Sequence, residues 1–174
     1  MIEKFIPDMY QKNIYTIDYK KLKNIGIRCL LFDLDNTIAP FNMKKPSKKI
    51  KDLIEKLKDM GFRVVLFSNA GKKKLTPFKE KLEVDCAASC KKPSKTKYLK
   101  VLKKYKLSEN EVAIIGDQLL TDVLGGNRVG IFTTLINPIS KNEIIFSRFN
   151  RIIENIIIKR LNKKGLFEKG KYYD

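Results

Sequence analysis

Two predicted strands end in carboxylates. The apolar run at residues 27–33 ends at Asp33, with Asp35 two residues later, and the run at 112–117 ends at Asp117, with Asp122 five residues later. Side chains two residues apart on an extended chain point the same way, so Asp33 and Asp35 can reach one reacting centre or one cation. Converging acids need a countercharge, which an oxygen-liganded Mg²⁺ supplies. A single aspartate is more often a turn or helix-cap residue, but two strands that end alike favour a carboxylate site.

Groups suited to an anion follow the other predicted strands. The run at 62–68 ends in Ser68 and Asn69, whose hydroxyl, amide and backbone N–H groups suit an anion at a helix start. Lys92 follows the short run at 86–89, where its ammonium can hold a phosphate oxygen and neutralise the acids. In so lysine-rich a chain any one lysine is ordinarily a solvated surface residue, and only its position singles out Lys92.

The elements that must position these groups alternate along the chain. Five short apolar runs, at 27–33, 62–68, 86–89, 112–117 and 131–136, are separated by helical patterns at 47–60, 72–82, 94–105 and 119–130. Short strands alternating with helices predict a doubly wound, three-layer α/β fold with a parallel sheet. Ligands bind such sheets beyond the carboxyl ends of the strands, where the four acids lie.

We expect a single domain over residues 1–174. Residues 1–26 are predicted to form a loop-rich strap over the sheet, residues 27–140 the α/β core, and residues 141–174 a basic amphipathic helix and tail. The helical pattern at 143–161 places one broad apolar face on the helix, made of Ile145, Phe149, Ile152, Ile153, Ile156 and Ile157, with Arg151 outside it. Two interpretations stay open for this helix: packing, on its own sheet or on a partner chain, and contact with an anionic membrane.

Composition excludes several classes of function. The 174 residues contain no His, which removes imidazole bases, Ser-His-Asp catalysis and His-ligated zinc. Three Cys without paired C-x-x-C motifs argue against a structural zinc module and favour a reducing compartment. The chain start has no apolar segment typical of a signal peptide, and no apolar run approaches the roughly 20 residues of a membrane span. We expect a cytoplasmic protein, with contact at the inner face of the membrane as an open alternative.

The net charge of +18 is concentrated in one region. Residues 44–106 contain 21 basic and six acidic residues, a net charge of +15. One interpretation is a surface for nucleic acid, anionic lipid or a polyanionic substrate. The other is the codon bias of an AT-rich genome, because most of the basic residues are Lys and phosphate-recognition surfaces tend to recruit Arg. Composition does not decide between them.

Four short motifs together resemble those of the haloacid dehalogenase (HAD) superfamily. They are DLDNT, SN, K-P and GDQLLTD, in this order and each at a strand end, and the resemblance covers roughly residues 27–136. The segments IGDQLLTDVLGGNRVG and SRFNR are most similar to subfamily IIIA phosphatases of the bacterial YqeG-like group. Relatives of this group include the phosphatidylglycerophosphate phosphatases of mitochondria.

The resemblance implies a role for each candidate residue. Asp33 would be the nucleophile that forms an aspartyl phosphate, and Asp35 the general acid and base. Mg²⁺ would be held by Asp33, the Asp35 backbone carbonyl and Asp117, with Asp122 in or near the second shell of ligands. The phosphoryl oxygens would be bound by Ser68, Asn69 and Lys92. An acid at position 35 favours a phosphatase, because dehalogenases lack it and ion-pump ATPases carry Thr there.

The motif spacings predict an open site. The gaps between Thr37 and Ser68 and between Asn69 and Lys92 hold only one helix and one strand each, so neither has room for the cap domain of many HAD enzymes. An open site accepts a phosphate on something large, and phosphatidylglycerophosphate is the leading substrate by family analogy. Two alternatives stay open: a phosphatase of another, soluble phosphomonoester, and a basic RNA- or ribosome-associated binding protein on a HAD scaffold. The oligomeric state is left undecided.

Overall fold

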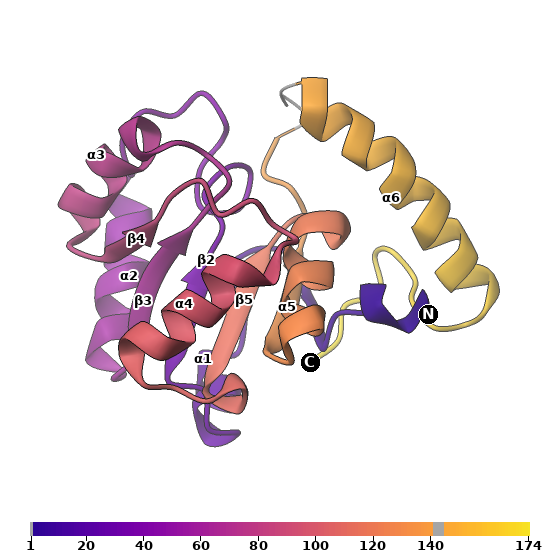
Figure 1. Ribbon diagram of the computed structural model, residues 1–174, viewed down its shortest axis with the longest axis horizontal. Helices are drawn as coiled ribbons and strands as arrows, with labels where there is room; N and C mark the ends of the chain where they lie inside the picture. The colour runs from indigo at the N-terminus through magenta and orange to yellow at the C-terminus, as the bar shows by residue number, and fades with distance from the viewer. Residues whose placement is uncertain (1, 141–144) are drawn as a thin grey trace.

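A six-stranded sheet, parallel throughout, forms the centre of the protein (Figure 1). The computed structural model describes residues 2–140 and 145–174, except for the side chains of residues 145–148. The strands are β1 (Met9–Gln11), β2 (Cys29–Phe32), β3 (Arg63–Phe67), β4 (Asp85–Ala87), β5 (Val112–Gly116) and β6 (Phe132–Ile136). Their order in the sheet is β1-β6-β5-β2-β3-β4.

The strand order reverses between β2 and β5. From β2 the chain winds outward through β3 and β4, then returns to the other side of β2 for β5 and β6. Phe32 on β2 is in register with Ile115 on β5, so the residues that follow the two strands are neighbours. A reversal of this kind is where an open α/β sheet binds its ligand. The doubly wound α/β fold predicted from the sequence is confirmed, with one strand more than expected.

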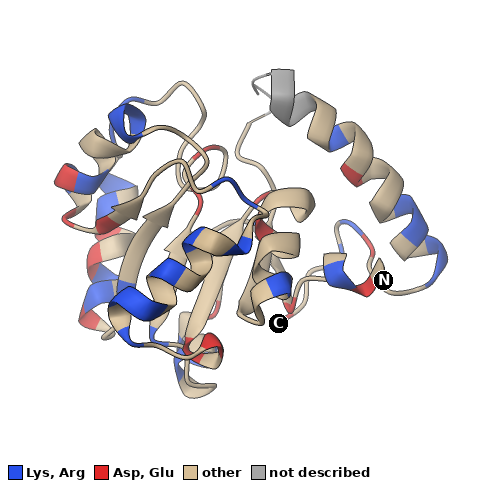
Figure 2. Cartoon of the chain, viewed as in Figure 1, with Lys and Arg blue, Asp and Glu red and all other residues tan. Residues whose placement is uncertain are grey.

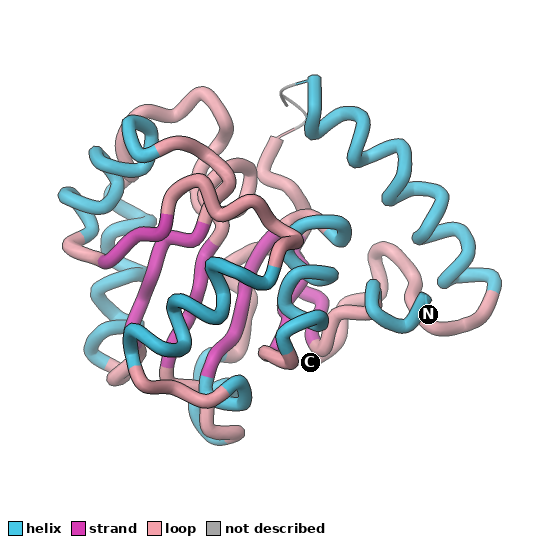
Figure 3. Tube along the Cα trace, viewed as in Figure 1, coloured by secondary structure: helices cyan, strands magenta, loops and turns pink. Residues whose placement is uncertain are grey.

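Helices cover both faces of the sheet, as the tube view in Figure 3 shows. On one face α1 (Tyr19–Asn24), α2 (Lys48–Asp59) and α3 (Lys72–Leu82) pack over Leu30 and Phe32, and on the other α4 (Lys95–Tyr105) and α5 (Leu124–Val129) lie over Cys29 and Leu31. Alternate residues of a strand point to opposite faces, so β2 reads as a continuous apolar run because both faces are buried. The short 3₁₀-helices η1 (Ile2–Phe5) and η2 (Glu109–Glu111) and the π-helical turn η3 (Leu119–Val123) complete this part of the chain.

Local sequence signals set the limits of the helices. Ser47 and Ser94 cap α2 and α4, each accepting a hydrogen bond from a backbone N–H of the first turn. Beyond the end of α2, Gly61 adopts a φ of +89°, a left-handed conformation that costs glycine little. These elements match the predicted ranges to within one or two residues.

The N-terminal segment differs from the prediction. The expectation of a loop-rich strap over the sheet is wrong for Met9–Gln11, which form the edge strand β1 paired with β6, and for Tyr19–Asn24, which form α1. Met9 and Tyr10 are buried, and Tyr173 in the C-terminal tail exchanges two backbone hydrogen bonds with Tyr10. A pattern of three residues is too short to predict a strand. The C-terminal tail, which is distant in sequence, buries these residues, and the sequence of the segment alone does not show this.

The C-terminal helix α6 (Ile145–Lys163) stands beside the sheet (Figure 1). Its predicted beginning at Glu143 lies outside the described residues. The helix packs on its own domain through Glu154, Ile157, Ile158 and Leu161. Only part of the predicted apolar face packs, because Ile157 contacts the core whereas Phe149, Ile152 and Ile156 are exposed. The polar residues Arg151 and Glu154 turn inward instead, since they bind the loop after β5.

No further domain interrupts the core between the motifs. Residues 38–67 hold a loop, α2 and β3, and residues 70–91 hold α3 and β4, all of them described by the structure. The site at the carboxyl ends of the strands is therefore without a cap from either segment. Among the described residues, no helix is long and apolar enough to cross a membrane.

Candidate active site

Three aspartates meet at the point where the strand order reverses. Carboxylate oxygens of Asp33, Asp117 and Asp122 all lie within 4.8 Å of one another, and all three residues are buried. The pairing of β2 with β5 brings the acids together. The Asp33 N–H continues this pairing beyond β2 by donating to the Ile115 carbonyl at 2.9 Å. Three buried acids so close together repel one another strongly unless cations neutralise them.

Lys92 supplies one of the cations. Its ammonium, whose side chain is 2% exposed, lies 2.7 Å from Asp33 Oδ1 and 2.6 Å from Asp122 Oδ1, and donates to the Phe67 carbonyl at 3.0 Å. All three N–H donors of the ammonium are therefore used. Position along the chain singled out this lysine, and the structure places it between the two aspartates.

Asn69 holds the loop that carries Lys92. Its side-chain oxygen accepts from the Lys92 N–H at 2.7 Å, and its amide donates to the Lys92 carbonyl at 3.2 Å. Ser68 is buried, and its hydroxyl oxygen accepts from the Ala70 N–H at 3.1 Å. Both residues line the pocket beside the acids, but the amide of Asn69 is occupied by backbone rather than directed at a ligand.

Arg151 on α6 binds the third aspartate. Its guanidinium donates to the Asp117 carbonyl at 2.7 Å and forms an ion pair with the Asp117 carboxylate, and it also contacts Glu154 at 2.9 Å. Glu154 in turn accepts from the Leu120 N–H at 2.9 Å. Thr37 donates to the other oxygen of Asp117 at 3.2 Å. The C-terminal helix is thus tied to the turn that carries Asp117 and Asp122.

Gly116 leaves room for the Asp122 carboxylate. A Cβ atom built at Gly116 would overlap the Asp122 side chain, closer than real Cβ contacts allow. The π-helical turn at Leu119–Val123 brings Asp122 back over the strand end, where its second oxygen accepts from the Gln118 N–H at 3.2 Å. The Gly-Asp pair of the sequence is therefore a steric requirement of the site.

Burial and neighbouring charges together shift the pKa values of Asp33, Asp117 and Lys92. Burial raises the pKa of Asp33 to about 6, although Lys92 opposes the shift. Burial, together with the carboxylates of Asp33 and Asp122, also raises the pKa of Asp117 well above its usual range, and Arg151 offsets this only in part. Burial alone would lower the pKa of Lys92, but Asp122 and Asp33 outweigh it and hold that pKa well above the ordinary value. Lys92 therefore remains charged.

Asp35 lies in the same pocket but outside the cluster of three acids. The pocket has a volume of about 410 Å³ and is lined by Asp33, Asp35, Lys92 and Asn150 of α6, among others. The Asp35 carboxylate is paired with Lys74 of α3 at 2.5 Å, and the Lys74 ammonium also sits 3.6 Å from the centre of the Phe41 ring. The predicted acid-base residue and the predicted nucleophile thus face one pocket.

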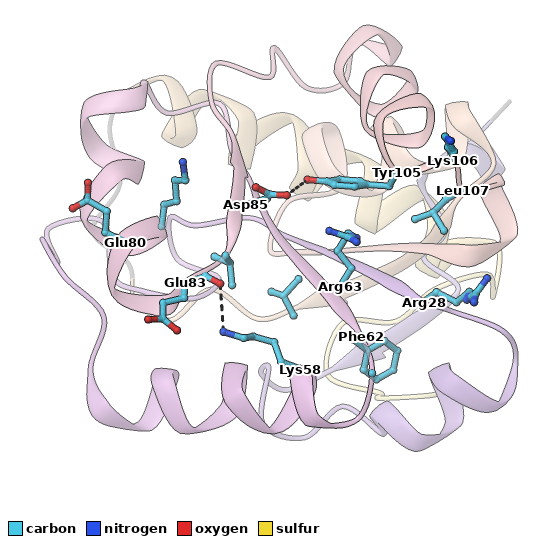
Figure 4. Close-up of a pocket in the computed structure, with 14 residues that line it drawn as sticks. Arg28, Lys58, Phe62, Arg63, Glu80, Glu83, Asp85, Tyr105, Lys106 and Leu107 are labelled. Atoms are coloured by element: carbon cyan, nitrogen blue, oxygen red, sulfur yellow. Dashed lines mark hydrogen bonds between the residues drawn. The ribbon is translucent and has the colours of Figure 1, made fainter.

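A larger hollow, of about 920 Å³, opens at the amino-terminal ends of β3 and β4, away from the acids (Figure 4). Three of its charged residues are engaged by a tyrosine or by backbone carbonyls. The Arg63 guanidinium lies 4.5 Å from the centre of the Tyr105 ring, and the Tyr105 hydroxyl donates to Asp85 at 2.5 Å. Lys58 donates to the Leu82 and Glu83 carbonyls that end α3. Size alone therefore does not identify the site.

The donor set fits Mg²⁺. Three buried carboxylates from the ends of two neighbouring strands offer hard oxygen ligands that converge within 4.8 Å. Asp33 and Asp117 would hold the ion. Asp122 already binds Lys92 and Gln118, which suits a supporting position.

Sequence reasoning missed two cations that the structure places at the site. Arg151 belongs to SRFNR, a segment that is distinguished only by its family resemblance. Its position outside the predicted apolar face does not indicate that its side chain contacts Asp117. Lys74 is one of three consecutive lysines, and only the orientation of α3 distinguishes it.

Comparison with known proteins relates this chain to a family of phosphatases. Residues 2–140 match the family described as mitochondrial PGP phosphatase. "Probable phosphatase YqeG" of Bacillus subtilis (strain 168) is 34% identical over 166 residues, which span 95% of this chain and 96% of that protein. Phosphatidylglycerophosphate phosphatase 1 of Arabidopsis thaliana is 32% identical over an alignment of 175 positions, which covers 92% of this chain and 49% of that protein.

A solved structure shares the fold. The Legionella pneumophila protein described as a HAD superfamily (subfamily III A) hydrolase is 18% identical, with a TM-score of 0.51. The match covers 86% of this chain and 94% of that one. At this identity the likeness shows the fold alone, and with the sheet topology it confirms the predicted HAD-like architecture.

Proposed function

The chain belongs to the PGP phosphatase family, a family of HAD-type phosphatases, and on this premise we propose that it hydrolyses a phosphomonoester through an aspartyl phosphate on Asp33. The observation that carries the proposal is the buried cluster of Asp33, Asp117 and Asp122 around the Lys92 ammonium. A stability role alone does not account for it, because buried ion pairs are often no better than apolar packing.

Asp33 is the proposed nucleophile. A carboxylate oxygen of Asp33 attacks phosphorus, the bond from phosphorus to the ester oxygen breaks, and the phosphoryl group is transferred to Asp33. Lys92 fixes the orientation of Asp33 through its 2.7 Å contact and supplies positive charge beside the transferred group. The Ser68 hydroxyl, which accepts from the Ala70 N–H and keeps its own proton to donate, and the Asn69 backbone N–H suit the phosphoryl oxygens.

Asp35 is the proposed proton donor and acceptor. It gives a proton to the departing alkoxide, then takes one from the water that attacks phosphorus and frees Asp33 and inorganic phosphate. Lys74 pairs with Asp35 and lines the same pocket, so its ammonium is available to a substrate oxygen when Asp35 is protonated. This assignment gives a protein without histidine both halves of its acid-base chemistry.

Mg²⁺ is the proposed cofactor, held by Asp33 and Asp117 with the Asp35 backbone carbonyl, and it would supply Lewis-acid stabilisation of the phosphoryl charge. Arg151 and Thr37 orient Asp117, and Gly116 leaves space for Asp122. The chain's own cations do not replace a divalent ion, because Lys92 and Arg151 neutralise two charges in a cluster of three acids.

The proposed substrate is a phosphorylated lipid headgroup, with phosphatidylglycerophosphate the leading candidate. The pocket is not covered by a cap from residues 38–67 or 70–91, which leaves it accessible to a phosphate on a large or membrane-bound molecule. The Arabidopsis relative is named for that substrate. All three cysteines are free thiols, which suits a reducing compartment.

The test is hydrolysis of an aryl phosphate and of phosphatidylglycerophosphate in Triton micelles by the full chain, with Mg²⁺ and with EDTA. We expect Mg²⁺-dependent release of phosphate that Asp33→Asn abolishes, with Asp52→Asn, on the exposed side of α2, as the control of equal charge change. No turnover on a broad panel of phosphomonoesters would overturn the enzymatic function. Nucleic-acid binding that is salt-sensitive and survives Asp33→Asn, without turnover, would favour the binding-protein alternative.

A further inference from the structure

One stripe of α6 is apolar and exposed. Phe149 and Ile152 are each 60% exposed, and Ile156 is 49% exposed. At about 100° per residue these three side chains fall on the same side of the helix, and Lys159, Arg160 and Lys163 continue that side toward its end. The six residues span an arc of about 100°. We call them the outer stripe.

The opposite side of α6 is the one that packs. Asn150, Glu154 and Leu161 are buried there, and Glu154 is the one acidic residue between 149 and 163. Its carboxylate faces inward, where it is held by Arg151 and the Leu120 N–H. The outer stripe therefore combines large apolar side chains with cations and contains no acidic residue. Figure 2 shows basic positions gathered toward the C-terminal end of α6.

The end of α6 that carries the apolar half of the stripe lies beside the active site, with the stripe on the far side of the helix from the pocket. Asn150, the neighbour of Phe149, lines the pocket that contains Asp33 and Asp35. In Figure 1 this end of α6 lies toward the same side of the molecule as the loop that follows β2. A surface that held the outer stripe would consequently lie one helix diameter, ~10 Å, from the pocket lining at Asn150.

We propose that the outer stripe docks the protein on an anionic lipid bilayer and so brings the pocket to phosphorylated headgroups. The identity of the substrate in this proposal rests on the proposed function, whereas the docking rests on the outer stripe alone. Apolar side chains rimmed by cations suit the interface of a bilayer with negative headgroups. A second copy of this chain is the less favourable occupant, because two chains of net charge +18 repel each other.

The test is co-sedimentation of the full chain with vesicles of equal parts phosphatidylcholine and phosphatidylglycerol, against vesicles of phosphatidylcholine alone. We expect binding to the anionic vesicles, weakened by salt. Phe149→Ser, Ile152→Ser and Ile156→Ser together lower the partition coefficient at least about tenfold. Replacing Lys159, Arg160 and Lys163 by Gln lowers it by about fivefold per residue.

Matched controls separate docking from folding and catalysis. Ile25→Ser and Leu99→Ser remove apolar side chains that are 50% and 49% exposed elsewhere on the surface, and leave vesicle binding unchanged. The triple Ser variant keeps its turnover of a soluble aryl phosphate, because none of its substitutions touches the pocket, and loses turnover of vesicle-bound phosphatidylglycerophosphate.

Three results would overturn the proposal: absence of binding to anionic vesicles, equal binding by the wild type and the triple Ser variant, or a wild-type dimer that this variant converts to a monomer. The last result would assign the stripe to a second copy. Absence of aryl phosphate turnover by the wild type would instead refute the proposed function, whether or not the protein binds the vesicles.

Discussion

Replacing Lys92 by Met removes a cation from the centre of the acidic cluster. The Lys92 ammonium is 2.7 Å from Asp33 and 2.6 Å from Asp122, and its side chain is almost wholly buried. Breaking a buried ion pair from one side costs roughly 3–5 kcal/mol, because the partner charge stays buried without compensation. Since two carboxylates lose the same partner, we expect the Mg²⁺-free variant to lose about 4 kcal/mol of unfolding free energy.

Added Mg²⁺ should return part of that loss. A ligand that binds only the folded state stabilises it by RT ln(1 + [L]/Kd), and a cluster deprived of its ammonium holds a divalent cation more tightly. The assay is urea unfolding of wild type and Lys92→Met with EDTA and with Mg²⁺. Lys104→Met is the control, because its pair with Asp85 is exposed and is expected to contribute less than about 1 kcal/mol.

Two results would contradict a neutralising role for the Lys92 ammonium. One is equal urea midpoints for Lys92→Met and Lys104→Met in EDTA, and the other is stabilisation of Lys92→Met by Mg²⁺ that is no larger than that of the wild type. Either outcome would mean that Lys92 does not neutralise the acids, and that its place between Asp33 and Asp122 has another cause.

Three further predictions concern the same cluster. Gly116→Ala pushes the Asp122 carboxylate from its place, so kcat/KM on an aryl phosphate falls about 100-fold, and wild-type kinetics would refute the steric argument. Arg151→Met leaves Asp117 without its guanidinium and costs about 2 kcal/mol in urea unfolding; a loss below about 0.5 kcal/mol would show that α6 does not secure the site. The pKa of Asp33 is about 6 in the folded state, above the ordinary value of about 3.9. Between these two pH values the folded state therefore binds more protons than the unfolded state. Metal-free stability should therefore fall as pH rises from about 4 to 7, less steeply in Asp33→Asn, and a rise over that range would contradict the pKa assignment.

The core and its chemistry are predictable because they follow local rules. β2 and β5 are buried on both faces, so their sequences are continuous apolar runs, and the polar residues that end them lie at the same edge of any parallel sheet. Lys92 is predictable for the same reason, since it follows the run that becomes β4. The observed meeting of Asp33, Asp117 and Lys92 needs no information beyond strand order.

The features that sequence reasoning missed depend on contacts between distant segments. β1 is a strand because β6 pairs with it and the tail at Tyr173 covers it, neither of which its three residues reveal. Arg151 turns inward to pair with Asp117, 34 residues away, so the packed side of α6 coincides only in part with its apolar periodicity. Lys74 reaches Asp35 because α3 points it there.

The central claim is that Asp33 carries the phosphoryl group during turnover. The direct measurement is acid quenching of the Mg²⁺-loaded enzyme during hydrolysis of an aryl phosphate, borohydride reduction, and mass spectrometry of the peptides. An acyl phosphate is reduced to an alcohol, so the account predicts homoserine at position 33, dependent on substrate and absent at the other aspartates. Turnover without homoserine at position 33, together with full activity of Asp33→Asn, would contradict it.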